Sequence, residues 1–367
     1  MKITYITAAF VLAFSVGCAG NTSEDISASK ENLAEGEDAL ASGGPATASA
    51  CPAAAAGFRV VACGAPLNAD VAGISGNTVF TSVTLTWDPA GPKNIYSQRF
   101  GSNRATLFAA NAVGFKLAGS TAFWVDAPRT TMFRRAVGST GVRSMSAASA
   151  STPVFGNFDV RGPRVVFLAG LLNANYLSMG SDLRGPSLLT GQAGFYMEEP
   201  FLASNGEFFG YAQDGFSPGF LKRFSDTKGT TAVVDGFPQI RSNPVDDAAN
   251  VYTLVRGLNF HKLRVLDKAT GAVVDRPTSV SDAGESLNVL TMGSGRIFGV
   301  RSWGFGGNER QVFAIDTSTG ATTVALDIAK SGFRMPSYVS AGVFNNTPVV
   351  SLNASSGIAQ SVILSAN

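Results

Sequence analysis

The chain has 367 residues, of which 45% are apolar and 15% are charged, and its formal net charge is +2. This composition excludes a protein that is disordered as a whole, because the apolar residues suffice for a large core. The basic residues are scattered singly and form no stripe, so we expect no nucleic-acid partner. The 41 glycines favour many short strands joined by tight turns.

Residues 1–17 have the pattern of a secretory signal peptide. Lys2 gives the positive start, and residues 3–16 form an uncharged, largely apolar run. This run is shorter than the roughly 20 apolar residues of a membrane-spanning helix. Residues 15–18 (SVGC) resemble the lipobox of bacterial lipoproteins, with Ser15 in place of the usual leucine. We therefore expect Cys18 to be lipidated, and an ordinary cleaved signal with an incidental cysteine is the alternative.

The segment after Cys18 predicts an exported, anchored protein. Ala19, rather than aspartate, follows the cysteine, which favours the outer membrane or cell surface with the lipid as the only membrane contact. Without lipidation the protein would be periplasmic. Residues 19–50 are rich in Ala, Ser, Gly and acidic residues, with a formal charge of −5 and no apolar periodicity. We predict a flexible tether over residues 18–56.

Two cysteines remain once Cys18 is assigned to the lipid. Cys51 and Cys63 would both lie in an oxidising compartment, where an even number of cysteines favours a disulfide. A loop this short would add about 3 kcal/mol of stability on the chain-entropy treatment. Two unpaired thiols are the alternative.

A repeat with a period of about 40–50 residues follows the tether. Each copy is a turn followed by an apolar run that carries one aromatic residue. The aromatic positions are separated by 43, 44, 42, 43 and 46 residues. They are Phe80, Phe123, Phe167, Phe209, Tyr252 and Phe298. A seventh, weaker copy at residues 345–350 lacks the aromatic residue.

Within a copy, alternating apolar runs predict four antiparallel strands. In the second copy these are residues 113–117, 121–125, 131–135 and 141–145. Four such strands in each repeat are typical of a blade of a β-propeller. We predict an all-β fold, a single β-propeller of about seven four-stranded blades over residues 57–367.

The ends of the chain predict how the ring closes. The last copy supplies three strands, at residues 338–344, 348–352 and 360–364. The missing outer strand is predicted to come from residues 57–63, just after the tether. Pairing of these two segments would remove the open sheet edges.

A recurring turn links the last two strands of three copies, at residues 226–229, 267–271 and 316–320. Each begins with an Asp that can accept backbone N–H bonds and ends with a Gly that tolerates positive φ. Two of these hairpins resemble those of the quinoprotein-like (PQQ-like repeat) β-propeller superfamily. The resemblance implies the propeller fold. Asp275 and Val324 replace the usual tryptophan of that repeat, so it implies no quinone, and we expect no cofactor.

The search for catalytic and metal-binding residues is mostly negative. The single histidine, His261, falls in a predicted third strand and is interpreted as a packed strand residue. Without a second histidine or clustered cysteines we expect no metal site. Glu198 and Glu199 precede Pro200. Neighbours in an extended segment point to opposite sides, so we interpret this pair as a solvated loop.

Polar loop residues predict the binding face. In a propeller the loops between second and third strands share one face with the connections between blades. Exposed Trp and Arg on loops are enriched at recognition surfaces, although Trp303 packed on its own blade is the alternative. The predicted ligand-binding residues are Asp126, Asp214, Arg256, Arg301, Trp303 and Arg310. The same face offers Asp88, Lys93, Arg129, Asn173 and Asn175.

These features give two hypotheses for function. The first is a non-enzymatic, monomeric binding or scaffold protein of the cell envelope, with an unknown protein or glycan as partner. The alternative is a propeller hydrolase or lyase that acts on envelope carbohydrate or ester through carboxylates near the central opening. Its candidates, Asp126, Asp214, Arg256 and Arg301, rest on fold analogy alone.

Overall fold

A computed structural model describes most of the chain after residue 50. The described residues are 51–86, 91–152, 154–170, 174–184, 187–192, 198–212, 220–224, 231–233, 240, 242–281, 285–303, 310–334, 340–354 and 360–366. They belong to one compact unit, Ala50–Asn367. The signal peptide, Cys18 and most of the tether lie outside the described residues.

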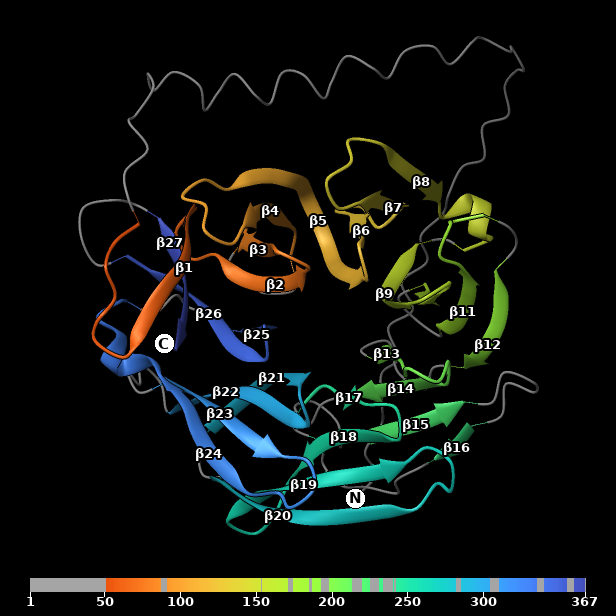
Figure 1. Cartoon of the computed structure of the whole chain (residues 1–367). Coiled ribbons are helices and arrows are strands. Elements are labelled where there is room, and N and C mark those ends of the chain that lie inside the picture. Colours follow the sequence, from red (N-terminus) through yellow and green to blue (C-terminus); the bar gives the residue numbers. More distant parts are fainter. Residues whose placement is uncertain are drawn as a thin grey trace, which may run out of the picture. The chain divides into compact units, whose positions relative to one another are not determined.

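The strands form antiparallel groups that follow one another along the chain (Figure 1). Their bounds are β1 Phe58–Ala65, β2 Asp70–Ser75, β3 Thr78–Thr84, β4 Lys93–Arg99, β5 Thr106–Ala118, β6 Thr121–Asp126, β7 Thr131–Ala136, β8 Val142–Ser146, β9 Phe155–Arg161, β10 Arg164–Ala169, β11 Asn175–Gly180, β12 Leu188–Gln192, β13 Glu199–Leu202 and β14 Phe208–Ala212. The later strands are β15 Phe220–Phe224, β16 Thr231–Val233, β17 Val245–Asp246, β18 Asn250–Val255, β19 Phe260–Asp267, β20 Val273–Ser281, β21 Glu285–Gly293, β22 Arg296–Trp303, β23 Arg310–Asp316, β24 Thr322–Asp327, β25 Ala341–Phe344, β26 Thr347–Asn353 and β27 Ser361–Ala366. Two short 3-10 helices are η1 Ala148–Ala150 and η2 Ile328–Ser331.

Strand β5 belongs to two groups. Its first half pairs with β4 and its second half pairs with β6, and Ala112 lies opposite both Lys93 and Asp126. The alternation predicted residues 113–117 as the first strand of the second copy, and these residues lie in the second half of β5, which pairs with β6. Dividing β5 at Ala112 sorts the strands into groups of four: β2–β5, β5–β8, β9–β12, β13–β16, β17–β20, β21–β24, and β25–β27 with β1.

The repeated aromatic residues explain the packing between groups. Each lies in the second strand of its group and is at most 3% exposed. Burial of such a side chain stabilises the fold by about 1.5–3 kcal/mol. Phe80 packs in a cluster with Trp124 of the next group, and Phe123 packs with Phe167 of the group after that. The period found in the sequence is therefore the spacing of residues that pack one sheet on the next.

The predicted Asp-Gly turns are confirmed at two of the three positions, and the turn at residues 226–229 lies outside the described residues. Asp267 Oδ1 accepts the backbone N–H of Thr270 at 2.7 Å, and Asp316 Oδ1 accepts that of Thr319 at 2.9 Å. The bond from Thr270 holds the pKa of Asp267 below its ordinary value. The hydroxyls of Ser318 and Thr319, together with the backbone N–H of Thr319, lower the pKa of Asp316 to about 2. Gly320 ends its turn at φ 78°, a backbone region that L side chains rarely adopt.

The N-terminal strand pairs with the C-terminal strand, as the sequence predicts. β1 runs antiparallel to β27, with Arg59 opposite Ser365 (Figure 1, orange beside blue). Ala62 and Ile363 join Val79 and Val349 in one buried cluster that connects the first and last groups. A closed ring of seven blades would require these contacts, and that blade count stays a prediction.

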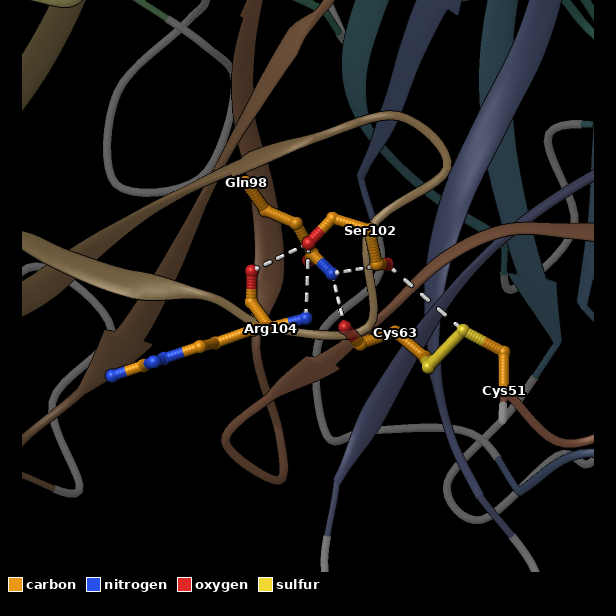
Figure 2. The surroundings of a disulfide bond; sticks show 5 residues. All are labelled: Cys51, Cys63, Gln98, Ser102 and Arg104. Atoms are coloured by element: carbon orange, nitrogen blue, oxygen red, sulfur yellow. Dashed lines mark hydrogen bonds between the residues drawn. A yellow bond between two sulfur atoms is a disulfide. The ribbon is translucent and has the colours of Figure 1, made fainter. Parts of the chain in front are cut away.

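The predicted disulfide is present. Cys51 and Cys63 are bonded, with their Cα atoms 5.7 Å apart (Figure 2). The bond fixes the segment before β1 to the strand itself, because Cys63 is a buried residue of β1. The disulfide therefore links the segment at Cys51 to the sheet formed by β1 and β25–β27.

Candidate functional site

A pocket of about 410 Å³ lies where the first strands of the groups meet. Its walls include residues of the first strands β2, β5, β9 and β13 and Ser340, just before β25, and β3, β4 and the β6–β7 turn also contribute. These first strands contact one another in succession, β2 with β5, β5 with β9, β9 with β13, and β25 with β2. The pocket therefore lies at the centre of the described unit. We call it the central pocket.

Asp70 is one of two carboxylates in the central pocket. Its Oδ1 accepts the backbone N–H of Ser340 at 2.6 Å and lies 2.7 Å from the Ser340 hydroxyl, which also lies 2.5 Å from the carbonyl oxygen of Val71. One hydroxyl proton can serve only one of these acceptors at a time. Burial raises the pKa of Asp70, although the Ser340 hydrogen bonds and the charge of Lys93 act against the rise. A protonated Asp70 would donate to Ser340 Oγ and leave that hydroxyl free to donate to Val71.

Glu199 is the second carboxylate of the pocket. Its side chain and that of the preceding Glu198 point to opposite sides of the backbone and have different partners. Tyr211 donates to Glu199 Oε2 at 2.6 Å. Glu198 is fully buried, where it accepts a hydrogen bond from Tyr176 at 3.1 Å and pairs with Lys222 at 2.7 Å. The two carboxylates do diverge, but the solvated-loop interpretation is wrong for Glu198. The sequence lacked any sign that β11 and β15 supply its partners.

Three cations complete the central pocket: Lys93, Lys116 and Arg129. Lys93 begins β4, Lys116 lies in β5, and Arg129 sits in the β6–β7 turn with φ 61°. Burial lowers the pKa of Arg129, which means that its charge is incompletely solvated. With two carboxylates against three cations, the pocket presents both signs of charge within a small volume.

A carboxylate on β9, Asp159, links two strands of the pocket wall, β9 and β13, by a hydrogen bond. Asp159 Oδ2 accepts the backbone N–H of Leu202 in β13 at 2.7 Å. Burial raises the pKa of Asp159, and the charge of Lys116 counteracts part of that rise. The sequence offered no signal for this contact, because the two strands are 43 residues apart.

The structure brings Lys93 and Arg129 of the predicted face into the central pocket, but the predicted ligand-binding residues lie in different places. Asp126 caps its own turn, with Oδ1 accepting the N–H of Thr130 at 2.7 Å and of Thr131 at 3.0 Å. Arg256 is exposed just after β18. Asp214, and the side chains of Arg301, Trp303 and Arg310, lie outside the described residues. The same holds for Asp88 and Asn173, whereas Asn175 begins β11.

The single histidine of the chain lies among the described residues. His261 is buried in β19, the third strand of its group, as the sequence predicts. Among the residues that the structure describes, no group of three or more His, Cys, Asp or Glu side chains is placed to hold a metal ion. Within the same residues, no helix has the length and apolar character to cross a membrane.

Comparison with solved structures identifies the architecture. The β-propeller domain of the Trilobed protease from Pyrococcus furiosus superposes with a TM-score of 0.54 at 9% identity, covering 84% of this chain and 96% of that domain. The fold is a β-propeller. YCF48 bound to D1 peptide gives 0.55 at 10% identity over 84% of this chain and 96% of YCF48. A chain of the mitotic checkpoint complex gives 0.53 at 14% identity over 97% and 98%.

No known sequence family and no curated protein matches this chain. The structural likeness establishes the propeller fold, and the quinoprotein-like superfamily stays a prediction from the two hairpins. The groups of strands are hereafter called blades, numbered from the blade that begins with β2.

Proposed function

We propose that this propeller is a non-enzymatic binding protein of the cell envelope and that the central pocket holds part of its ligand. The observation that carries the proposal is the convergence of three cations and two carboxylates in one hollow of about 410 Å³. Concave sites of this size with a few convergent polar groups are the usual places for ligands. Because the pocket contains both positive and negative side chains, it favours a polar ligand that itself carries groups of both signs.

The hydrogen bonds of the pocket support a binding role. Asp70 is held by Ser340, and Glu199 is held by Tyr211. Side chains fixed in this way are ordered before a ligand arrives, so less conformational entropy is lost on binding. The arrangement therefore suits recognition of a ligand with a defined placement of charges.

We propose a peptide segment of an envelope protein as the ligand. A peptide offers N–H groups to Asp70 and Glu199 and carbonyl or carboxylate oxygens to Lys93, Lys116 and Arg129, all of which line the pocket. Support by analogy comes from YCF48, a propeller of similar fold whose solved structure is that of a complex with D1 peptide. A propeller offers a rigid platform for such a segment.

The pocket is tested with an array of peptides from envelope proteins. We expect Lys116→Gln and Glu199→Gln each to weaken binding of a selected peptide about tenfold, the usual loss for one charge-assisted hydrogen bond. Arg184→Gln is the matched control, because Arg184 is exposed and is not among the pocket residues. Peptides that bind both pocket variants as tightly as the wild type would place the ligand elsewhere.

Anchoring is a separate part of the proposal. The lipobox-like residues 15–18 and the acidic segment 19–50 support a lipid at Cys18 and a tether to the propeller. We expect Cys18→Ser to release the protein from membranes in a fractionation experiment. A wild-type protein that is already soluble and begins at another residue would contradict lipidation.

A hydrolase or lyase is the second candidate, and one observation favours it. Two carboxylates line the central pocket, and the raised pKa of Asp70 would allow that residue to hold a proton as a general acid. Turnover of an envelope polysaccharide or ester that disappears in both Asp70→Asn and Glu199→Gln would favour this candidate over a binding protein. Binding without turnover would favour the first proposal.

A further inference from the structure

The net positive charge of the propeller is confined to its first third. Residues 51–150 contain nine Lys and Arg against three Asp and Glu, whereas residues 151–367 contain seventeen of each sign. In the sequence these basic residues are spread over 85 positions, from Arg59 to Arg143, and only Arg134 and Arg135 are adjacent. The tertiary structure brings Arg99, Arg104 and Arg135 together in one groove of about 550 Å³.

This arginine groove lies between the outer strands of the first two blades, away from the central pocket. Its walls include the last residues of β4 and the turns that join third to fourth strands, near Ser102 and Gly138. Strand β4 runs from Lys93 in the central pocket to Arg99 in the groove. At about 3.3 Å for each residue, the two sites are roughly 20 Å apart along this strand.

The described residues leave the charge of the groove unpaired. None of those that line it is a carboxylate, and within the described part of the chain Arg99, Arg104 and Arg135 form no ion pair. The Arg135 guanidinium lies over the ring of Phe108, with Cζ 3.5 Å from the centroid. Burial lowers the pKa of Arg135, so its charged form is incompletely solvated. A bound anion would supply the missing compensation.

The loop that carries Arg104 is held in place before any ligand binds. Gln98 Nε2 donates to the carbonyl oxygen of Ser102 at 3.0 Å and also to that of Cys63, which is part of the disulfide (Figure 2). Ser102 Oγ in turn donates to the carbonyl oxygen of Arg104 at 3.0 Å. Figure 2 shows the Arg104 side chain directed away from the disulfide. The guanidinium is thus presented from a fixed backbone.

Strand β1 approaches the loop that carries Arg104 so closely that position 64 must be glycine. A Cβ atom on Gly64 would lie 2.2 Å from the carbonyl oxygen of Asn103, and Gly64 has φ +96°. Only glycine accepts both conditions. Strand β1 can therefore lie directly against the loop and hold it with the N–H of Cys63, which donates to Ser102 at 3.1 Å.

We propose that the arginine groove is a second binding site, for an oligosaccharide that carries carboxylate or sulfate groups. The planar guanidinium matches such anions with two parallel hydrogen bonds. Thr78, Ser97 and Thr106 also line the groove, and their hydroxyls suit the hydroxyl groups of a sugar. The groove volume falls in the range that holds drug-sized ligands, so it exceeds what a single inorganic ion fills.

The test uses residues 19–367 and isothermal titration calorimetry at low salt. The probes are a trimer of galacturonic acid, its full methyl ester, a sulfated neutral trimer and triglutamate. We expect the acidic trimers to bind, with affinity falling as salt rises, and the relative affinities of the carboxylate and sulfate trimers identify the anion. Arg104→Gln and Arg135→Gln should each weaken binding about tenfold.

Arg134→Gln is the matched control, because Arg134 neighbours Arg135 in β7 and lies on the other side of that strand, opposite Arg143. Lys116→Gln in the central pocket should leave trimer binding unchanged, which separates this site from the proposed peptide site. Arg104 is exposed, so its variant should keep the circular dichroism spectrum of the wild type. Absence of trimer binding, equal binding of the methyl ester, tighter binding of triglutamate, or unchanged binding by Arg104→Gln would overturn the proposal.

Discussion

Reduction of the disulfide should destabilise the propeller by about 3 kcal/mol. Cys51 and Cys63 are 12 residues apart, and the entropy that closing such a loop removes from the unfolded chain gives this magnitude. The bonded segment also packs on the fold, since Cys51 and Ala54 lie against the cluster between the sixth and seventh blades. For a unit of this size, Ala50–Asn367, the loss corresponds to a decrease in Tm of about 5 °C.

The assay is urea unfolding of residues 19–367, which lack Cys18, with and without a thiol reductant. Tryptophan fluorescence and far-ultraviolet circular dichroism should give coincident transitions, which justifies a two-state free energy of unfolding. We expect a lower midpoint with an unchanged slope. The double variant Cys51→Ala with Cys63→Ala is the control. Its free energy of unfolding should equal that of the reduced wild type and should not change when the reductant is added.

One result would refute the reasoning. If thiol titration shows that the bond has opened and the free energy of unfolding stays within about 0.5 kcal/mol of the oxidised value, the loop-entropy argument does not apply here. A lower slope would instead show that the reduced protein no longer unfolds as one unit, whereas a small increase would reflect a less compact unfolded chain. Reduction should also weaken binding in the arginine groove, because Cys63 helps to hold the loop that carries Arg104.

The remaining predictions concern closure, ionisation and a buried ion pair. Deletion of residues 57–64 should cause aggregation or loss of cooperative unfolding, because it exposes the edge of β27, whereas deletion of residues 19–50 should be nearly neutral. In denaturant titrations, the stability of Asp70→Asn relative to the wild type should rise from pH 4 to pH 7. Because the pKa of Asp70 is raised in the folded wild type, the unfolded chain loses this proton at a lower pH, and the wild type loses stability as the pH rises. Lys268→Met should lose about 2 kcal/mol, because it removes one of the two cations, Lys268 and Arg161, that pair with the buried Asp246, and leaves Oδ2 without the Lys268 ammonium at 2.5 Å.

Each of these has its own control. A stable monomer without residues 57–64 would mean that the ring closes in another way. A constant stability difference between Asp70→Asn and the wild type over this pH range would show that burial does not raise the pKa of Asp70. Lys262→Met, at an exposed position of β19, the strand that ends just before Lys268, should change stability by less than about 0.5 kcal/mol. An equal loss in both lysine variants would contradict the ion-pair argument.

Local chemistry made the architecture predictable. The aromatic residue of each second strand recurs because it is buried against a neighbouring blade, so its period is visible in one dimension. The turn at Asp316 is equally local, since Asp and Gly act within five residues. The pairing of β1 with β27 followed from counting strands, because an unpaired edge is unfavourable.

The central pocket was only partly predictable. Lys93 and Arg129 were expected on the binding face because they lie in loops whose place in a blade is known. Asp70, Lys116 and Glu199 lie within or at the start of strands, where polar residues look like ordinary alternation. They converge because first strands of different blades meet at the centre, and no local pattern records which strand faces which.

The sequence by itself determined the repeat, the all-β fold, the order of the strands and the turns between them, because hydrophobic periodicity and turn chemistry act over a few residues. Only the tertiary structure decided which charges share a site. Glu198 is buried because strands β11 and β15 supply Tyr176 and Lys222. Arg99 and Arg135, 36 residues apart in the sequence, share a groove because two sheets pack side by side. Contacts between sheets depend on the packing of whole blades, and that packing leaves no short-range signal in the chain.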